Sequence, residues 1–245
     1  MFKKFLNGVH EMVKAVKNRK KKAKPSAGGT AERHEQLRES LLRAAERTVA
    51  AEGHQALRAR ALAEEVGCAV GAIYNVFPDL DALVLAAKAR ALDALDGELA
   101  RAVARADETV GANATAREMA VRKLLALAET YLDFATDRLP IWRMLFEYRI
   151  APTAEVPAWY QARLADLFTH LEAPLRAIVP DLAAQKRASL ARALFSAVHG
   201  VVALGLEQKF DKASRATIEA QAATIVRACV AGLMIPEQRD EIVSL

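Results

Sequence analysis

The segment Leu57–Phe77, LRARALAEEVGCAVGAIYNVF, holds the side chains whose types and spacing point most clearly to a chemical role, and that role is binding. Leu62 and Val66 lie four residues apart, which gives a short helix an apolar face. Gly67 can supply a tight turn, and helical spacing restarts at Val70. A short helix, a glycine turn and a second short helix predict a helix-turn-helix, whose second helix enters the major groove of DNA.

The second helix of this motif, over residues 70–76, contains no acidic residue. Phosphates repel carboxylates, so this absence fits a DNA-facing surface. Small residues at Ala63, Gly71 and Ala72 predict that the two helices cross closely.

Helices must position the motif, because helical periodicity runs through almost every window from residue 32 onward and no sustained alternating stretch demands a sheet. Glycine, proline and aspartate separate the periodic stretches. The helices are predicted at about 32–52, 59–66, 70–76, 79–106, 116–137, 140–149, 157–178, 182–207 and 214–234. The predicted fold class is all-α, with an N-terminal three-helix helix-turn-helix domain and a larger helical domain.

The composition is that of an ordinary globular chain: 245 residues, 53% hydrophobic and 27% charged. This excludes collagen-like, wholly disordered and disulfide-stapled proteins. The longest uncharged stretch, 193–206, has 14 residues, whereas a membrane-spanning helix needs about 20 apolar residues. We therefore expect no membrane span. The two cysteines lie far apart without a CxxC pattern, so a cytoplasmic location is expected.

The N-terminal segment Met1–Lys24 carries nine Lys or Arg residues against one acid, although the whole chain has a net charge of only +5. Its apolar residues recur at helical spacing, and the following residues 25–29 form a Pro/Gly/Ser linker. Such a segment fits an arm on DNA, a helix on an anionic membrane surface, or a disordered tail. The membrane reading makes the chain a membrane-surface-associated helical binding protein, which is the alternative function.

The chain resembles the TetR family of bacterial transcriptional regulators over about residues 35–85. The resemblance is carried by the run from Arg38 to Ala45 and by Gly53, Ala63, Gly67, Gly71, Ile73, Tyr74, Phe77 and Leu83. The segment Phe195–Leu206, FSAVHGVVALGL, is similar to a His-Gly segment in one group of the family's ligand-binding domains. The charge pattern and the resemblance together predict three parts: a basic N-terminal extension (1–30), the helix-turn-helix domain (31–78), and a helical effector-binding and dimerisation domain (79–245).

The resemblance also implies a DNA surface on the second helix. Tyr74 matches the family's phosphate-contacting tyrosine, and Asn75 can read adenine with paired hydrogen bonds. The remaining positions expected to meet base edges are Ala69, Val70 and Ala72. Ile73 and Phe77 are expected to pack the core instead.

Two residues depart from the family's usual pattern: Val76 replaces a common histidine, and Leu80 replaces a lysine that contacts the DNA backbone. The departures predict fewer phosphate contacts. Arg58, Arg60 or the basic extension can supply substitutes, and deleting the extension should then weaken binding to every DNA sequence alike.

Aromatic residues gather between residues 116 and 178, which favours either plain core packing or a cavity for an apolar molecule. The family resemblance raises the cavity reading. The expected ligand pocket consists of Phe134, Trp142, Phe146, Trp159, Phe168 and His199. A buried, satisfied histidine remains the commoner role for His199, and no metal or cofactor site is expected.

The last two long helices are rich in small and aliphatic residues and favour a two-fold, four-helix dimer interface, which the family also uses. An interior helical hairpin in a monomer is the alternative. The expected interface residues are Leu194, Val198, Val201, Val202, Ile225, Val226, Cys229 and Leu233.

These features predict a dimeric, ligand-responsive regulator, by family default a repressor, that binds a palindromic DNA operator and is released by a small, largely apolar effector. The helix at 79–106 would connect effector binding to DNA binding. This coupling requires the effector to bind the DNA-bound and DNA-free states with different affinities. No enzyme is expected, because the GxGxxG, GxxxxGK[ST], HExxH and GxSxG motifs are all missing from the sequence.

Overall fold

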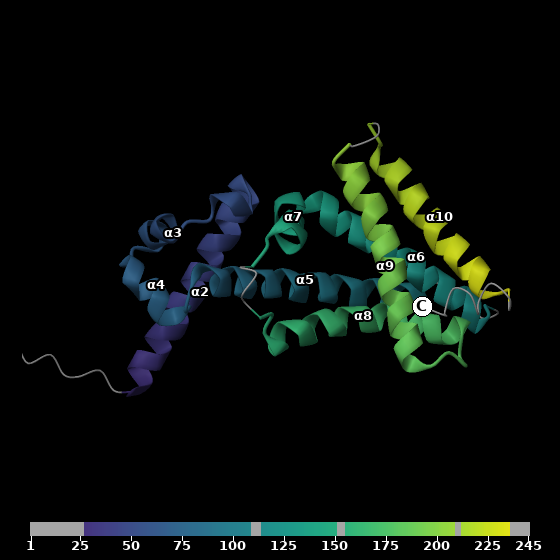
Figure 1. Ribbon diagram of the computed structural model, residues 1–245, viewed down its shortest axis with the longest axis horizontal. Helices are drawn as coiled ribbons and strands as arrows, with labels where there is room; N and C mark the ends of the chain where they lie inside the picture. The colour runs from purple at the N-terminus through teal and green to yellow at the C-terminus, as the bar shows by residue number, and fades with distance from the viewer. Residues whose placement is uncertain (1–26, 109–113, 151–154, 209–211, 236–245) are drawn as a thin grey trace, which may run out of the picture. The chain divides into compact units, whose positions relative to one another are not determined.

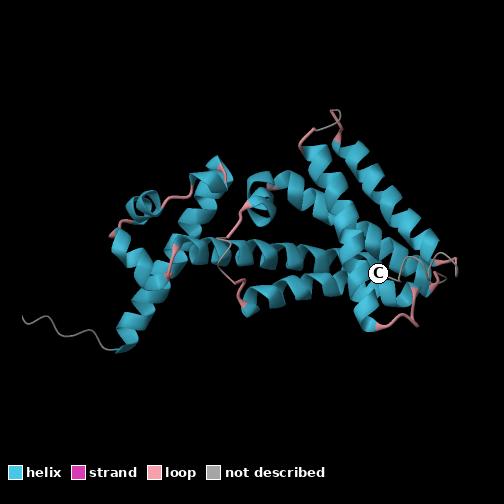
Figure 2. Cartoon of the chain, in the orientation of Figure 1, coloured by secondary structure: helices cyan, strands magenta, loops and turns pink. Residues whose placement is uncertain are grey.

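The computed structural model describes residues 27–108, 114–150, 155–208 and 212–235. Within these ranges the chain holds helices and connecting loops without any strand, as Figure 2 shows. The all-α prediction is confirmed. The basic segment 1–24, with its proposed roles on DNA or on a membrane, lies outside the described residues and stays a prediction.

Nine α-helices and one short 3-10 helix make up the described chain (Figure 1). They are α2 (Ala27–Glu52), η1 (His54–Ala56), α3 (Ala59–Val66), α4 (Val70–Val76), α5 (Leu80–Glu108), α6 (Ala116–Asp137), α7 (Leu139–Glu147), α8 (Ala158–Ile178), α9 (Ala184–Leu206) and α10 (Arg215–Leu233). Each predicted helix has its counterpart. The start of α2 precedes the predicted one, and η1 was missed because three residues carry no periodic signal.

The chain divides into two compact units, residues 1–40 and 41–245, so that the boundary falls inside α2. The described part of the first unit is the N-terminal stretch of that helix. The second unit contains everything from Leu41 onward. The predicted domain limits at 30/31 and 78/79 remain predictions.

Local signals in the sequence explain where these helices begin and end. Gly67 ends α3 in the left-handed region with φ of 74°, and the Cys68 amide donates to the Ala63 carbonyl at 2.9 Å. At the start of α6, the Thr115 hydroxyl accepts from the Glu118 amide while the Glu118 carboxylate accepts from the Thr115 amide. The first cap fixes the turn of the helix-turn-helix, and the second fixes the first turn of α6.

The large core of the second unit is formed by α5 to α10. In Figure 1, α5 and α8 run side by side, and α9 pairs with α10. The core is aliphatic, with Leu92 and Leu95 from α5, Leu124 and Leu127 from α6, and Leu194 from α9. Close packing of this kind holds the bundle through dispersion and the hydrophobic effect.

By length and apolarity, α9 is the one helix in the described ranges that could cross a bilayer, with the bent pair α4 and α5 as a second candidate if taken together. Core helices of water-soluble proteins share this composition, so it is weak evidence for a membrane span. Only 28% of the apolar window of α9 is buried within the chain. A helix so apolar and so little covered has surface to offer to a partner.

Candidate functional site

The orientation of α4 is set by two buried side chains. Ile73 is fully buried and Phe77 is 3% exposed, as the sequence predicts for core residues. Elsewhere on α4, Val70 is 36% and Tyr74 is 48% exposed. A helix anchored on one face leaves its other face open for a ligand as large as duplex DNA.

The helix before it, α3, is held by both packing and charge. Leu62 and Ala63 are buried, and Arg47 of α2 forms an ion pair with Glu65 at 2.7 Å. Because Arg47 and Glu65 both remain partly exposed, the pair contributes little free energy and mainly defines an orientation.

The predicted DNA-contact residues lie together on the surface of this motif. Ala69 and Asn75 are exposed and Ala72 is half-buried. Arg60 is exposed on the first turn of α3, whereas Arg58 donates to the carbonyls of Gln55 and Leu57 at 2.6 and 2.8 Å. The role of each in DNA binding stays a prediction. Arg58 would have to release its backbone contacts to reach a phosphate.

Gly71 requires a correction. The sequence suggested that it lets α3 and α4 cross closely, but a Cβ at this position would meet nothing within 4 Å. Gly71 is exposed on α4, so the helix crossing does not depend on it. Its missing side chain matters only to something that approaches from outside.

The departing residues Val76 and Leu80 are both half-buried and flank the turn between α4 and α5. The side chain of Asp79 accepts a hydrogen bond from the Ala82 amide at 2.7 Å, which caps α5. Leu80 opens that helix. A partly buried leucine cannot supply the phosphate contact that a lysine would make.

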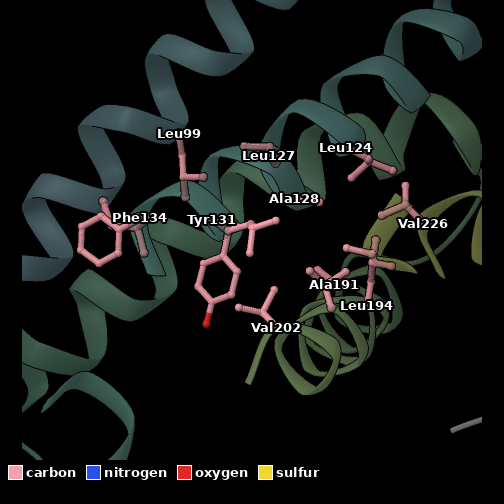
Figure 3. Packing of buried hydrophobic residues seen from close by; sticks show 14 of the residues in the cluster. Leu99, Leu124, Leu127, Ala128, Tyr131, Phe134, Ala191, Leu194, Val202 and Val226 are labelled. Atoms are coloured by element: carbon pink, nitrogen blue, oxygen red, sulfur yellow. The ribbon is translucent and has the colours of Figure 1, made fainter. Parts of the chain in front are cut away.

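The second candidate site is an apolar cavity of about 120 Å³ inside the helical bundle. Its wall comes from six helices, α5 to α10, and is almost entirely hydrocarbon. The lining residues are Leu92, Leu95, Leu99, Leu124, Leu127, Ala128, Tyr131, Leu145, Phe146, Tyr160, Leu164, Leu167, Phe168, Leu171, Leu194, Phe195, Val198 and Val226. Figure 3 shows part of this wall, with Leu127 and Tyr131 on one side and Leu194 and Val226 on the other. Such a cavity suits an apolar guest of about the size of a benzene ring.

The six predicted pocket residues divide into three groups. Phe146 and Phe168 line the cavity. Trp142 and His199 lie behind it and reach it through hydrogen bonds to Tyr131. The other two lie elsewhere: Phe134 is buried beneath the Arg138 guanidinium, which sits 4.9 Å from its ring, and Trp159 is 44% exposed. Phe134 and Trp159 are therefore not lining residues of this cavity.

The six predicted pocket residues leave out Tyr131, one of the aromatic residues between 116 and 178, which is the polar centre of the site. Its hydroxyl accepts a hydrogen bond from Trp142 Nε1 at 2.9 Å and lies 2.6 Å from His199 Nδ1. Burial raises the pKa of the Tyr131 hydroxyl and lowers the pKa of His199, so both groups are neutral at neutral pH. The leucines of α5 and α8 were missed too, because a leucine on a helical face looks the same whether it fills a core or lines a cavity.

One residue connects the bundle to the helix-turn-helix. Tyr148, directly after α7, donates a hydrogen bond to Asp81 near the start of α5 at 2.5 Å. Its ring also contacts His54 of η1 edge-on, with centroids 5.9 Å apart. Burial, followed by the hydrogen bond and charge of Asp81, raises the pKa of the Tyr148 hydroxyl, so it stays a donor. Two residues earlier, Phe146 lines the cavity.

The predicted dimer residues lie deeper than expected. Five of them are buried within the chain itself: Leu194, Val198, Val202, Val226 and Leu233. Val201, Ile225 and Cys229 are half-buried. The outer side of α9 is made instead by Ala193, Ser196, Ala197 and Leu204, all exposed, and that of α10 by Ala220, Thr224, Ala228 and Ala231. These exposed residues, most of them small, and not the buried ones are available to a partner.

An exposed α4 on a helix-turn-helix, attached to a helical bundle with an apolar cavity, defines a DNA-binding regulator. Residues 41–87 match the family model for bacterial regulatory proteins of the tetR family, and residues 124–234 match the model for the tetracyclin repressor-like C-terminal domain. The chain belongs to the TetR family of transcriptional regulators. The family's regulators are DNA-binding proteins without enzymatic activity, so the prediction of no enzyme is confirmed by the family.

Solved structures share the fold. A protein of unknown function from Rhodococcus sp. RHA1 is 24% identical with a TM-score of 0.60, over 78% of this chain and 94% of that one. A tetR-family transcriptional regulator from Streptomyces coelicolor is 17% identical with a TM-score of 0.58, over 86% and 87% of the two chains. No curated protein matches the sequence.

Proposed function

We propose that this TetR-family regulator is a dimeric repressor that binds a palindromic operator and leaves it when a small, largely apolar effector occupies the cavity. DNA as its partner places its action in the cytoplasm. Two copies of α4 would have to reach successive major grooves, about 34 to 36 Å apart or a multiple of that. An effector acts only if it binds the DNA-free arrangement more tightly than the DNA-bound one.

One observation carries the link between effector and DNA: α7 lines the cavity, and the residue that follows it contacts η1 and α5, which flank the helix-turn-helix. Phe146 lines the cavity, while Tyr148 holds Asp81 and His54 beside the helix-turn-helix. A guest that displaces the Phe146 ring also moves the backbone leading to Tyr148. The position of α5 relative to η1 depends on that tyrosine.

The operator assay comes first. Fluorescence anisotropy would measure binding of the full chain to the intergenic DNA beside its own gene, in a salt series. We expect saturable, sequence-selective binding. Tyr74→Ala should lower affinity by tenfold or more, because a hydrogen bond to a charged phosphate contributes about 1.5 to 3 kcal/mol. Trp159, an aromatic residue of similar exposure on α8, provides the matched control, and Trp159→Ala should bind like wild type.

A chain starting at Ala31 completes this experiment. If the basic extension supplies phosphate contacts, its loss weakens binding to every sequence equally and flattens the salt slope. Purely non-specific binding that vanishes with the extension would overturn the operator proposal, and vesicle flotation of the two chains would then test the membrane-surface alternative.

The dimer proposal rests on the exposed small residues of α9 and α10. Their small side chains let two helices approach closely and form a two-fold four-helix contact. Ala197→Arg should convert the dimer into a monomer in sedimentation velocity. Ala173→Arg, on the exposed side of α8, is the matched control and should leave the mass unchanged. A wild-type monomer at the concentrations that saturate DNA would refute the dimer.

A further inference from the structure

The exposed residues of α4 form one continuous stripe. They are Val70, Gly71, Tyr74 and Asn75. Because an α-helix has 3.6 residues per turn, positions that are one, four and five residues apart lie side by side on its surface. Ile73 is fully buried and anchors the helix away from this stripe. The stripe is therefore the surface that α4 can offer to the major groove of DNA.

The stripe carries few polar groups. Helix α4 contains no lysine, arginine or histidine and no acid. Its polar side chains are the Tyr74 hydroxyl, which we expect at a phosphate, and the Asn75 amide. Guanine presents two acceptors in the major groove, O6 and N7, and is read most often by arginine or lysine. Helix α4 therefore lacks the usual means of recognising guanine.

Thymine and adenine present groups that fit the stripe. Thymine carries a methyl group at C5 in the major groove, and apolar side chains recognise it by contact. Val70 is 36% exposed and has two methyl groups to offer, whereas Ala72 is only half-buried surface with one. Asn75 is exposed, and an asparagine amide pairs with N6 and N7 of adenine.

Gly71 explains how so short a side chain as valine can reach a base. A helix that reads methyl groups through valine has to lie closer to the base edges than one that reads through arginine. A Cβ at Gly71 would meet nothing within 4 Å, so this part of the stripe is open. The glycine permits a close approach because no side chain there holds the DNA away.

We propose that α4 recognises A·T pairs: Val70 packs against the C5 methyl group of a thymine, and Asn75 pairs with an adenine, in each half-site of the operator. Guanine is not among the bases that α4 reads. The inference rests on the proposed operator function and specifies the bases that the same surface recognises.

Uracil substitution tests the methyl contact. The operator fragment that the full chain binds selectively would be synthesised with uracil in place of thymine, which deletes the C5 methyl group and keeps every hydrogen-bonding group of the base. By anisotropy, wild type should bind the uracil duplex about fourfold more weakly for one contacted thymine, and about 15-fold more weakly for one in each half-site. Burying one methyl-sized group changes affinity by about that factor.

The variant Val70→Ser separates this contact from any effect of uracil on the shape of the DNA. It should bind the thymine and uracil duplexes with nearly equal affinity, because the serine hydroxyl gains nothing from the methyl group. Val156→Ser is the matched control. Val156 is 38% exposed on the loop before α8, and its variant should keep the full loss of affinity for the uracil duplex.

Analogues of adenine and guanine test the other contact. 7-Deazaadenine lacks the N7 acceptor and should weaken binding of wild type by about 2- to 12-fold, the value of one neutral hydrogen bond. It should not weaken binding of Asn75→Ala any further. 7-Deazaguanine should leave the affinity of wild type unchanged.

The outcomes distinguish base recognition from operator binding itself. If the fragment is bound selectively but uracil changes nothing, or if Val70→Ser keeps the loss for the uracil duplex, the methyl contact is overturned and the operator proposal stands. A loss with 7-deazaguanine and none with 7-deazaadenine would overturn the assignment to A·T pairs. If wild type selects no fragment, the operator proposal fails and base recognition fails with it.

Discussion

The helix-turn-helix and the cavity bundle use their side chains in opposite ways. On α4 the candidate contact residues are exposed, with Tyr74 at 48%, while separate residues such as Ile73 hold the helix in place. In the bundle, Tyr131 and Phe168 serve the cavity and the packing at once. Function and stability should therefore separate in the helix-turn-helix and remain coupled in the bundle.

This difference has a physical cause. DNA is a large convex partner, so a protruding helix can meet it without any opening in the core. A small apolar guest is held only if protein surrounds it, and its contacts must come from residues that otherwise face each other. The bundle accordingly builds its site from six helices, and the helix-turn-helix from adjacent residues.

The largest expected effect is on stability in the bundle. Phe134→Ala removes a ring that is 1% exposed and should lower the free energy of unfolding by about 3 to 5 kcal/mol. Urea denaturation followed by circular dichroism would measure it. Tyr74→Ala in the same assay should change stability by less than about 0.5 kcal/mol, although it weakens DNA binding. Equal losses in the two variants would refute the proposed separation.

Next is the close contact of α9 with α10. A Cβ added at Gly205 would lie 2.6 Å from Ile218 Cγ1 and 2.7 Å from Cδ1, so Gly205→Ala should cost about 1 to 3 kcal/mol. Ile218→Val shortens the opposing side chain and should recover part of that loss in the double variant. If the two single-variant changes in the free energy of unfolding simply add in the double variant, the contact between Gly205 and Ile218 is not specific.

A smaller effect concerns Lys88, which is 6% exposed. Its ammonium donates a long hydrogen bond, 3.5 Å, to the Tyr148 carbonyl and lies 5.8 Å from the centroid of the Tyr160 ring. Burial lowers its pKa below 10.5, so the unfolded chain binds this proton more tightly. Stability should therefore rise as pH approaches 10.5. Lys88→Met should abolish that rise and add about 1 to 2 kcal/mol at pH 7. Denaturation at pH 7 and 9.5 compares the two chains, and an unchanged pH slope in the variant would exclude the mechanism.

The smallest effect is at Gly71. A Cβ there meets open space, so Gly71→Ala should stabilise the chain by about 0.5 to 1 kcal/mol through helix propensity. The same methyl group would stand between α4 and the DNA backbone and should lower operator affinity. Thermal unfolding and anisotropy measure the two changes. If the variant is more stable but its operator affinity is unchanged, Gly71 does not lie on the DNA-facing surface.

Much of the fold could be predicted because its signals are local. Leu62, Gly67 and Ile73 lie within a dozen residues, and the apolar spacing and the glycine turn determine their structure whatever surrounds them. Helix limits from α3 to α10 follow from the same short-range rules. The DNA-facing helix was predictable for that reason.

The sites in the bundle were less predictable. Trp142 and Trp159 are both aromatic residues at helical spacing, yet one is 2% and the other 44% exposed. Leu194 and Val198 were expected at a partner surface and lie instead in the chain's own core. Phe134 does not line the cavity, although Tyr131, three residues earlier on α6, does.

The sequence by itself determined the helices, the helix-turn-helix and the family, because hydrogen bonds within four residues and apolar periodicity encode them. Only the tertiary structure decided which faces are covered and which three polar groups meet. Trp142, Tyr131 and His199 come from α7, α6 and α9, and they become neighbours through the packing of those helices.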